Sequence, residues 1–264
     1  MACYLDLVKS TGYGTVANHA YEEISTYALQ PDKQRLAEPE YFFADTRDEM
    51  LKAIRQNIHY GATVIKIVVD DQRYIYSADD IRFIIDEAAR AGMKVAAHCW
   101  GERGARNAAE AGVASIDHGR VMNDEILLIA KKNGVALVGT EYLALNYDKA
   151  GHDVWVDRLR RAYKIGVTLV YGTDVIDMVD GQTRGTLAIS GISPWIEAGV
   201  SPQATLKAMT GNAARLLGVD KQRGFLRVGL AADIIAVPEN PLENINTLEH
   251  VNFVMKNGVV IKRD

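Results

Sequence analysis

The sequence predicts an α/β fold built on a parallel sheet. Short runs of apolar and β-branched residues alternate five times with segments of helical periodicity, at a spacing of roughly 20 to 35 residues that is typical of βα units. Two of these runs end in a histidine followed closely by glycine, at His98 and His118. Parallel strands present such side chains at their C-terminal ends, so the pattern indicates a functional site as well as a fold.

The composition is that of an ordinary globular protein. The 264 residues are enough for one large α/β domain or for a barrel with a small appendage. The formal charge of −4 predicts no basic surface for nucleic acid or a membrane, and no apolar run approaches the ~20 residues of a membrane span. The first residues lack the pattern of a secretory signal. We therefore expect a cytoplasmic protein that binds neither nucleic acid nor membranes.

The N-terminal part of the chain carries loop-like residues and a broken apolar pattern, so no element is assigned within residues 1–45. A surface position is expected for His19, which lies there. The first clear helix covers residues 46–60, because a capping residue and acids precede apolar residues at a spacing near 3.6. Residues 62–69 form a β-branched run too continuous for a half-exposed strand, so we expect a strand buried on both faces.

The rest of the chain continues the alternation and then changes character. Helices are expected where acids or a capping residue begin the helical period and glycine ends it. They cover residues 77–91, 104–111, 123–132, 154–164, 186–198, 203–209 and 212–217; strands are expected at 95–98, 114–118, 135–138 and 167–171, and loops at 139–153 and 177–184. From Gly224 onward, short apolar runs separated by turns predict a small β structure, with a hairpin at Asn257-Gly258.

Four polar residues stand within or at the ends of separate predicted strands: Lys66, His98, His118 and Asp174. Each alone has an ordinary explanation, such as a hydrogen-bonded core histidine or a helix cap. In a barrel, however, all four would converge on one mouth, and imidazole and carboxylate are ligands that zinc-like metals prefer. A lysine in an apolar strand must lose its proton or gain a partner, and a neutral amine could react with carbon dioxide to form a carbamate.

These residues resemble the motifs of the amidohydrolase superfamily, and its prolidase-like and imidazolonepropionase-like branch is the most similar. Val-Ile-Lys66-Ile, His98, Asp117-His118-Gly119 and Gly172-Thr173-Asp174 look like strands four, five, six and eight of that family's barrel. A second match, over residues 209–218, 232–237 and 255–258, is similar to the end of the barrel and the start of a C-terminal β-sandwich. The resemblance implies a (β/α)8 TIM-type barrel over residues 1–218 and part of a β-sandwich over residues 219–264.

The resemblance implies a metal-dependent hydrolase of carbon–nitrogen bonds in amides, peptides or cyclic amides. It implies one or two divalent metal ions, zinc foremost, with carboxylated Lys66 as a bridging ligand. His98 and His118 would hold one metal and Asp174 the other. Asp174 would also transfer a proton as the metal-activated hydroxide attacks the carbonyl of a small substrate, such as a dipeptide or a cyclic amide.

Four further residues have side chains that could take part in binding or catalysis. Tyr74 or Tyr76 could donate a hydrogen bond to the tetrahedral oxyanion, although a packed loop tyrosine is the simpler explanation. Arg184 could bind a substrate carboxylate, or it could be a solvated surface residue. Cys99 lies in an apolar strand pattern, where a buried free thiol is expected rather than a catalytic one.

The sequence departs from the family pattern in one respect, because it contains no His-x-His pair like that of the family's first strand. We therefore expect a barrel that is incomplete at its N-terminal side. Open sheet edges invite pairing, so a homo-oligomer is expected. Two functions stay open: a metal-dependent amidohydrolase, or a non-catalytic fragment that needs oligomerisation or an N-terminal partner. A phosphate-binding barrel is disfavoured because Asp174 would repel the anion.

Overall fold

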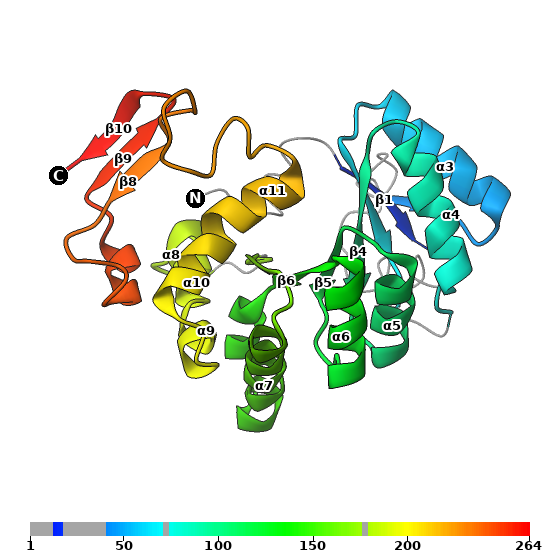
Figure 1. The fold of residues 1–264 in the computed structure, drawn as a ribbon, viewed down its shortest axis with the longest axis horizontal. Helices are drawn as coiled ribbons and strands as arrows, with labels where there is room; N and C mark the ends of the chain where they lie inside the picture. The colour runs from blue at the N-terminus through cyan, green and yellow to red at the C-terminus, as the bar shows by residue number, and fades with distance from the viewer. Residues whose placement is uncertain (1–12, 18–40, 71–73, 176–178) are drawn as a thin grey trace.

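The computed structural model describes residues 13–17, 41–70, 74–175 and 179–264, and its described part is built on a parallel sheet (Figure 1). The strand order is β2-β1-β3-β4-β5-β6-β7, and each neighbouring pair is parallel. The strands are β1 (Tyr13–Ala17), β2 (Tyr41–Phe43), β3 (Val64–Val68), β4 (Lys94–Cys99), β5 (Ser115–His118), β6 (Ala136–Gly139) and β7 (Leu169–Tyr171). The four strands expected after residue 90 and the strand expected at 62–69 are all present. This confirms the predicted α/β class and a partial TIM-type barrel.

Strands β1 and β2 lie within residues 1–45, where the sequence pattern allowed no element to be assigned. β1 lies between β2 and β3, with Thr15 opposite Lys66. Its strand conformation comes from backbone pairing with a distant part of the chain, which the local sequence does not encode. His19 and Cys3 lie outside the described residues.

The helices of the described part are α3 (Arg47–His59), α4 (Ala78–Ala89), α5 (Glu102–Ala111), α6 (Asp124–Asn133), α7 (Lys149–Ile165), α8 (Arg184–Ser190), α9 (Ser193–Glu197), α10 (Pro202–Lys207) and α11 (Ala213–Leu217). Helices α3 to α7 cover the outer side of the curved sheet (Figure 1). Helix α11 packs against the other face. Helices α3 to α6 confirm the expected ranges to within a few residues. Helix α3 begins at a complete capping box between Thr46 and Glu49, as its sequence indicates.

Two expected ranges are wrong in detail. Residues 139–153 are not a loop, because a 3-10 helix, η2 (Glu141–Asn146), follows β6, and α7 begins at Lys149. Asp148 caps α7 by accepting a hydrogen bond from the Gly151 amide. The helix expected over 186–198 is divided into α8 and α9, and Pro194 stands in the first turn of α9, where its missing N–H is tolerated.

Apolar side chains pack on both faces of the sheet, which explains the continuous apolar runs. The larger core lies between the sheet and the helices. A second cluster, made of Ala96, Ala136, Val138 and Val170, lies on the opposite face. Every residue of β5, β6 and β7 is buried. The strands therefore form a rigid frame for the polar residues at their C-terminal ends.

A small antiparallel sheet of β8 (Ile234–Ala236), β9 (Phe253–Lys256) and β10 (Val259–Arg263) closes the chain. Asn257 and Gly258 have φ of 49° and 81°, as a two-residue hairpin turn of type I′ requires, so the predicted hairpin is confirmed. Two further short elements are a π-helical turn, η3 (Ala208–Asn212), and a 3-10 helix, η4 (Ile245–His250). The division into domains at residues 218 and 219 stays a prediction. No helix in the described ranges is long and apolar enough to cross a membrane.

The turn between β4 and α5 depends on a glycine inside the helix. The buried Asp70 carboxylate accepts hydrogen bonds from the Trp100 and Gly101 amides at 2.5 and 2.9 Å. A methyl group on Gly104 would collide with that carboxylate. We expect Gly104→Ala to lower the free energy of unfolding by about 1–3 kcal/mol, measured by urea denaturation.

The matched control is Gly185→Ala in helix α8. A methyl group there meets its nearest atom, Thr183 Oγ1, at 3.5 Å, an ordinary contact. Since alanine favours a helix over glycine, this variant is expected to be neutral or slightly stabilised. Equal stability of the two variants would contradict the role of the Asp70 carboxylate.

Candidate active site

The lysine within β3 forms a buried ion pair. The Lys66 ammonium contacts Asp117 Oδ2, and the two side chains are 12% and 3% exposed. Asp117 also accepts a hydrogen bond from Ser115 Oγ at 3.0 Å. Lys66 has therefore gained a partner, which is one of the two outcomes that its position in an apolar strand allows.

Two histidines face each other beside this pair, at the C-terminal ends of β4 and β5. The ring centroids of His98 and His118 are 4.5 Å apart. The Trp100 ring stacks on His98 and meets His118 edge-on, with centroid distances of 6.0 and 5.5 Å. The Trp100 ring therefore restricts the orientation of both imidazoles.

His118 also faces groups from the next two strands. Its Nδ1 is 2.9 Å from Thr140 Oγ1, just after β6, and 3.9 Å from Asp174 Oδ2, just after β7. The backbones of His118 and Asp174 have φ of 66° and 49°, a region that residues other than glycine rarely adopt. Backbone strain of this kind concentrates at functional sites. Four neighbouring strands thus direct polar side chains to one place.

The electrostatic environment keeps His118 uncharged at neutral pH. Burial is the main cause that lowers its pKa well below 6.5, and neighbouring His98, Lys66 and Arg158 lower it further. A neutral imidazole has one nitrogen with a free lone pair, so His118 can act as a ligand or as a hydrogen-bond acceptor.

Whether these residues suit a metal ion can be judged from their donor types and arrangement. Neutral imidazole and carboxylate are appropriate ligands for a divalent metal, and His98, His118 and Asp174 lie close together. Yet the described ranges contain no group of three or more His, Cys, Asp and Glu side chains arranged to hold a metal. The donors fit in type, but a closed metal site is not assembled from these ranges alone.

Comparison with known proteins decides the family. The model of the amidohydrolase family matches residues 9–261. This chain belongs to the amidohydrolase family. The resemblance seen in the strand-end motifs is thereby confirmed.

Similar proteins include characterised hydrolases. This amidohydrolase is 30% identical to the ochratoxinase of Aspergillus niger over 97% of its own length and 58% of the relative's length. It is 28% identical to the imidazolonepropionase of Symbiobacterium thermophilum over 71% of this chain and 42% of that protein. The chain therefore spans 58% and 42% of the lengths of these two curated relatives.

Solved structures agree with this assignment. The A. niger ochratoxinase structure superposes with a TM-score of 0.76 and 27% identity, covering 96% of this chain and 65% of that chain. A Xaa-Pro dipeptidase with bound methionine superposes with a TM-score of 0.74, covering 99% of this chain and 77% of that chain, and its 24% identity supports the fold alone.

Other predicted residues of this amidohydrolase lie in different surroundings. Tyr76 is buried, and its hydroxyl donates to the Ala44 carbonyl at 2.5 Å, while burial raises its pKa far above the usual value. Tyr76 thus lies in the core, which agrees with the simpler explanation of a packed tyrosine, and its role as an oxyanion donor stays a prediction. Tyr74 is exposed, and Arg184 is exposed at the first residue of α8; their roles stay predictions. Cys99 is a buried free thiol, as expected.

Several polar residues around the site were not predicted from the sequence. Asp117 belongs to the Asp117-His118-Gly119 motif but was given no role of its own, although an acid beside His118 in a buried strand is a signal for a functional role. Thr140, Glu141 and Arg158 gave no signal. Thr140 and Glu141 lie in the range expected to be a loop, and Arg158 is one of several arginines in α7.

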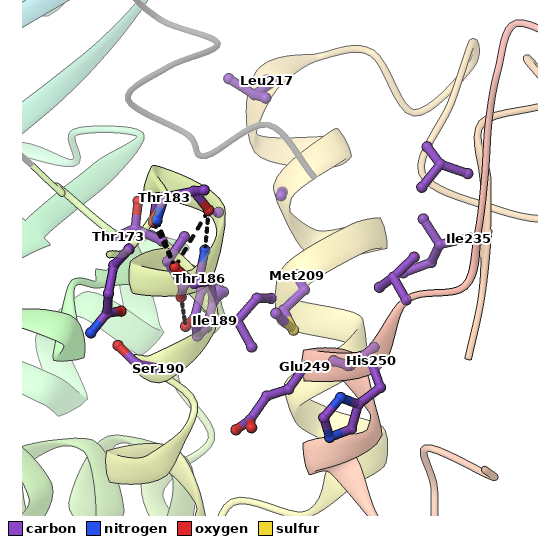
Figure 2. A pocket seen from close by; sticks show the side chains of 18 residues that line it. Thr173, Thr183, Thr186, Ile189, Ser190, Met209, Leu217, Ile235, Glu249 and His250 are labelled. Carbon is purple, nitrogen blue, oxygen red and sulfur yellow. Dashed lines mark hydrogen bonds between the residues drawn. The ribbon is translucent and has the colours of Figure 1, made fainter. Parts of the chain in front are cut away.

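A separate cavity of about 630 Å³ lies between the barrel and the small sheet. Figure 2 shows Thr183, Thr186 and Ser190 on one side and Ile235, Glu249 and His250 on the other. Thr173 also lines it, but Lys66, His98, His118 and Asp174 do not. The cavity therefore adjoins the strand that carries Asp174 and does not contain the polar cluster.

Proposed function

We propose that this amidohydrolase hydrolyses carbon–nitrogen bonds of amides or peptides, with a dipeptide or a cyclic amide as substrate. The observation that supports the proposal is the convergence of Lys66 with Asp117, His98, His118 and Asp174 at the ends of neighbouring parallel strands. Active sites of barrel enzymes occupy this position. The hydrolase names of its relatives support the same reaction class.

Asp174 is the candidate for proton transfer. Its side chain is 28% exposed, whereas that of His118 is 5% exposed, so solvent and a substrate reach Asp174 more easily than His118. A carboxylate in this position can accept a proton from an attacking water and deliver it to the leaving nitrogen. The His98 and His118 pair then orients the reacting groups beside it.

We further propose that His98 and His118 would hold a divalent metal ion, most suitably zinc, with Asp174 and a carboxylated Lys66 as additional ligands. When bound, such an ion polarises a carbonyl and lowers the pKa of a coordinated water to about 7. For Lys66 to become carboxylated, its ammonium must separate from Asp117 and lose a proton. Binding of carbon dioxide and breakage of the Lys66–Asp117 pair are therefore coupled.

The first experiment measures metal content and hydrolysis together. The chain is purified without chelator, incubated with zinc and bicarbonate, and analysed by plasma mass spectrometry and for amine release from a panel of N-acyl amino acids and dipeptides. We expect one or two metal equivalents per chain and amine release, both lost in His98→Ala. His59→Ala is the control, because His59 is exposed on α3. Retention of both properties by His98→Ala would contradict the proposed site.

A second candidate function follows from the sequence, which contains no His-x-His pair. The chain could be a non-catalytic unit that needs a second copy or an N-terminal partner to complete the site. This candidate predicts no metal binding and no hydrolysis for the isolated chain, together with self-association in gel filtration. A monomer that binds metal and turns over substrate would exclude it.

A further inference from the structure

A buried charged cluster lies behind His118, and the proposed reaction does not use it. Arg158 of α7 and Glu141 of η2 are both fully buried, with Arg158 Nη1 2.8 Å from Glu141 Oε1. The Trp195 indole of α9 donates to Glu141 Oε2 at 2.9 Å. The Arg158 guanidinium also lies over the Trp155 ring, 5.3 Å from its centroid. One ion pair and one hydrogen bond, both made by Glu141, therefore join three helical elements.

The Glu141–Arg158 pair is a poor source of stability. Two desolvated charges are often replaced by apolar residues with no loss of stability. Burial lowers the pKa of Arg158 against the opposing effect of Glu141, and Arg158 Nε and Nη2 have no hydrogen-bond partner in the described part of the chain. A role other than stabilisation therefore accounts better for this pair.

The pair determines the geometry of the turn after β6. A methyl group on Gly139 would collide with the Glu141 carboxylate, so this side chain folds back over the end of the strand. Thr140 lies between these two residues and is 1% exposed. Its backbone has φ of −112° and ψ of 47°, outside both helix and strand values. Glu141, anchored from α7 and α9, thereby places the Thr140 hydroxyl 2.9 Å from His118 Nδ1.

This contact bears on which nitrogen of neutral His118 carries the proton. Nδ1 faces two oxygens, the Thr140 hydroxyl at 2.9 Å and the Asp174 carboxylate at 3.9 Å. A carboxylate only accepts hydrogen bonds, so Asp174 favours a proton on Nδ1, and the Thr140 hydroxyl, which can donate or accept, is the nearer oxygen able to accept a hydrogen bond from that proton. We propose that Thr140, held by the Glu141–Arg158 pair, is a positioning residue that keeps the His118 proton on Nδ1 and leaves Nε2 available to a ligand. The His118 tautomer can be measured whether or not the chain is a hydrolase. Only the effect of the tautomer on catalysis rests on the proposed function.

The tautomer is read by long-range ¹H–¹⁵N NMR of the ¹⁵N-histidine-labelled, metal-free chain. We expect a protonated Nδ1 and an unprotonated Nε2 at His118. Thr140→Val removes the hydroxyl with little change of shape and is expected to shift His118 toward the other tautomer, while Thr140→Ser restores the original one. Thr205→Val is the control, since this buried threonine donates only to a backbone carbonyl in α10. A proton on Nε2 in the unmodified chain, or no change in Thr140→Val, would overturn the proposal.

The contribution of the ion pair is tested by replacing both charges. Glu141→Gln with Arg158→Met leaves no unpaired buried charge, and the glutamine oxygen can still accept from Trp195. We expect this double variant to remain folded by circular dichroism and to show mixed His118 tautomers. A single unchanged tautomer would show that the pair does not place Thr140, and that part of the proposal would be wrong.

Metal and activity measurements separate this proposal from the proposed function. Loss of a hydrogen-bond partner behind a metal-binding histidine lowers metal affinity or activity by about 10–100-fold. We expect Thr140→Val to lower zinc affinity and kcat in that range with little change of KM, and Thr140→Ser to recover both. If the chain binds no zinc and turns over no amide, the proposed function fails, but the NMR result still decides the role of Thr140.

Discussion

Asp174→Asn is expected to lower kcat for amide hydrolysis by about 10²–10⁴-fold, the usual contribution of a general acid or base. The carboxylate is 28% exposed and so accessible to substrate, and an amide cannot accept and return a proton. The backbone should be unaffected, because asparagine tolerates the left-handed conformation that Asp174 adopts at φ 49°. The measurement is steady-state amine release, with circular dichroism to verify folding.

Asp180→Asn serves as the matched control for this variant. Asp180 is an exposed acid on the same segment after β7, so the substitution makes the same change of charge. We expect its kcat to equal that of the unmodified chain. An unchanged kcat in Asp174→Asn, or an equal loss in both variants, would show that Asp174 does not transfer the proton.

Lys66→Met is expected to lower the free energy of unfolding by about 3–5 kcal/mol, because it leaves the Asp117 carboxylate buried without its counter-charge. The Ser115 hydroxyl still donates to Asp117 Oδ1, but one neutral hydrogen bond does not replace an ammonium. Methionine has nearly the length of lysine, so the loss reports charge and not a cavity. Urea denaturation followed by tryptophan fluorescence measures the change.

Two comparisons make this result specific. Lys66→Met combined with Asp117→Asn removes both charges and is expected to recover part of the lost stability. Lys149→Met removes the lysine of an exposed ion pair with Asp153, where solvent screens the charges, and little change is expected. A double variant that is less stable than Lys66→Met would contradict the ion-pair explanation.

Helices α3 to α6 could be predicted because their signals are local. Thr46 and Ser77 cap their helices through contacts with residues three positions away, and Gly112 and Gly134 end α5 and α6 in the left-handed conformation. Strand β1 could not be predicted in this way. It depends on pairing with β3, about fifty residues later, and the local residue preferences do not indicate that pairing.

The candidate site could also be predicted only in part. Lys66, His98, His118 and Asp174 were recognisable because strand position and chemical type together are unusual in an apolar sheet. The hydrogen-bond partner of Tyr76 could not be predicted, since nothing near it in the chain indicates that its hydroxyl donates to the Ala44 carbonyl, thirty-two residues earlier.

The amino-acid sequence alone was sufficient for the parallel α/β class, the family and the strand ends that carry the polar cluster. Periodicity, caps and short motifs are properties of neighbouring residues, which explains this success. Only the tertiary structure showed that Asp117 partners Lys66, that Thr140 contacts His118 and that Glu141 and Arg158 are buried together. These contacts join residues from 17 to 51 positions apart, and their chemistry exists only when folding excludes water from both partners.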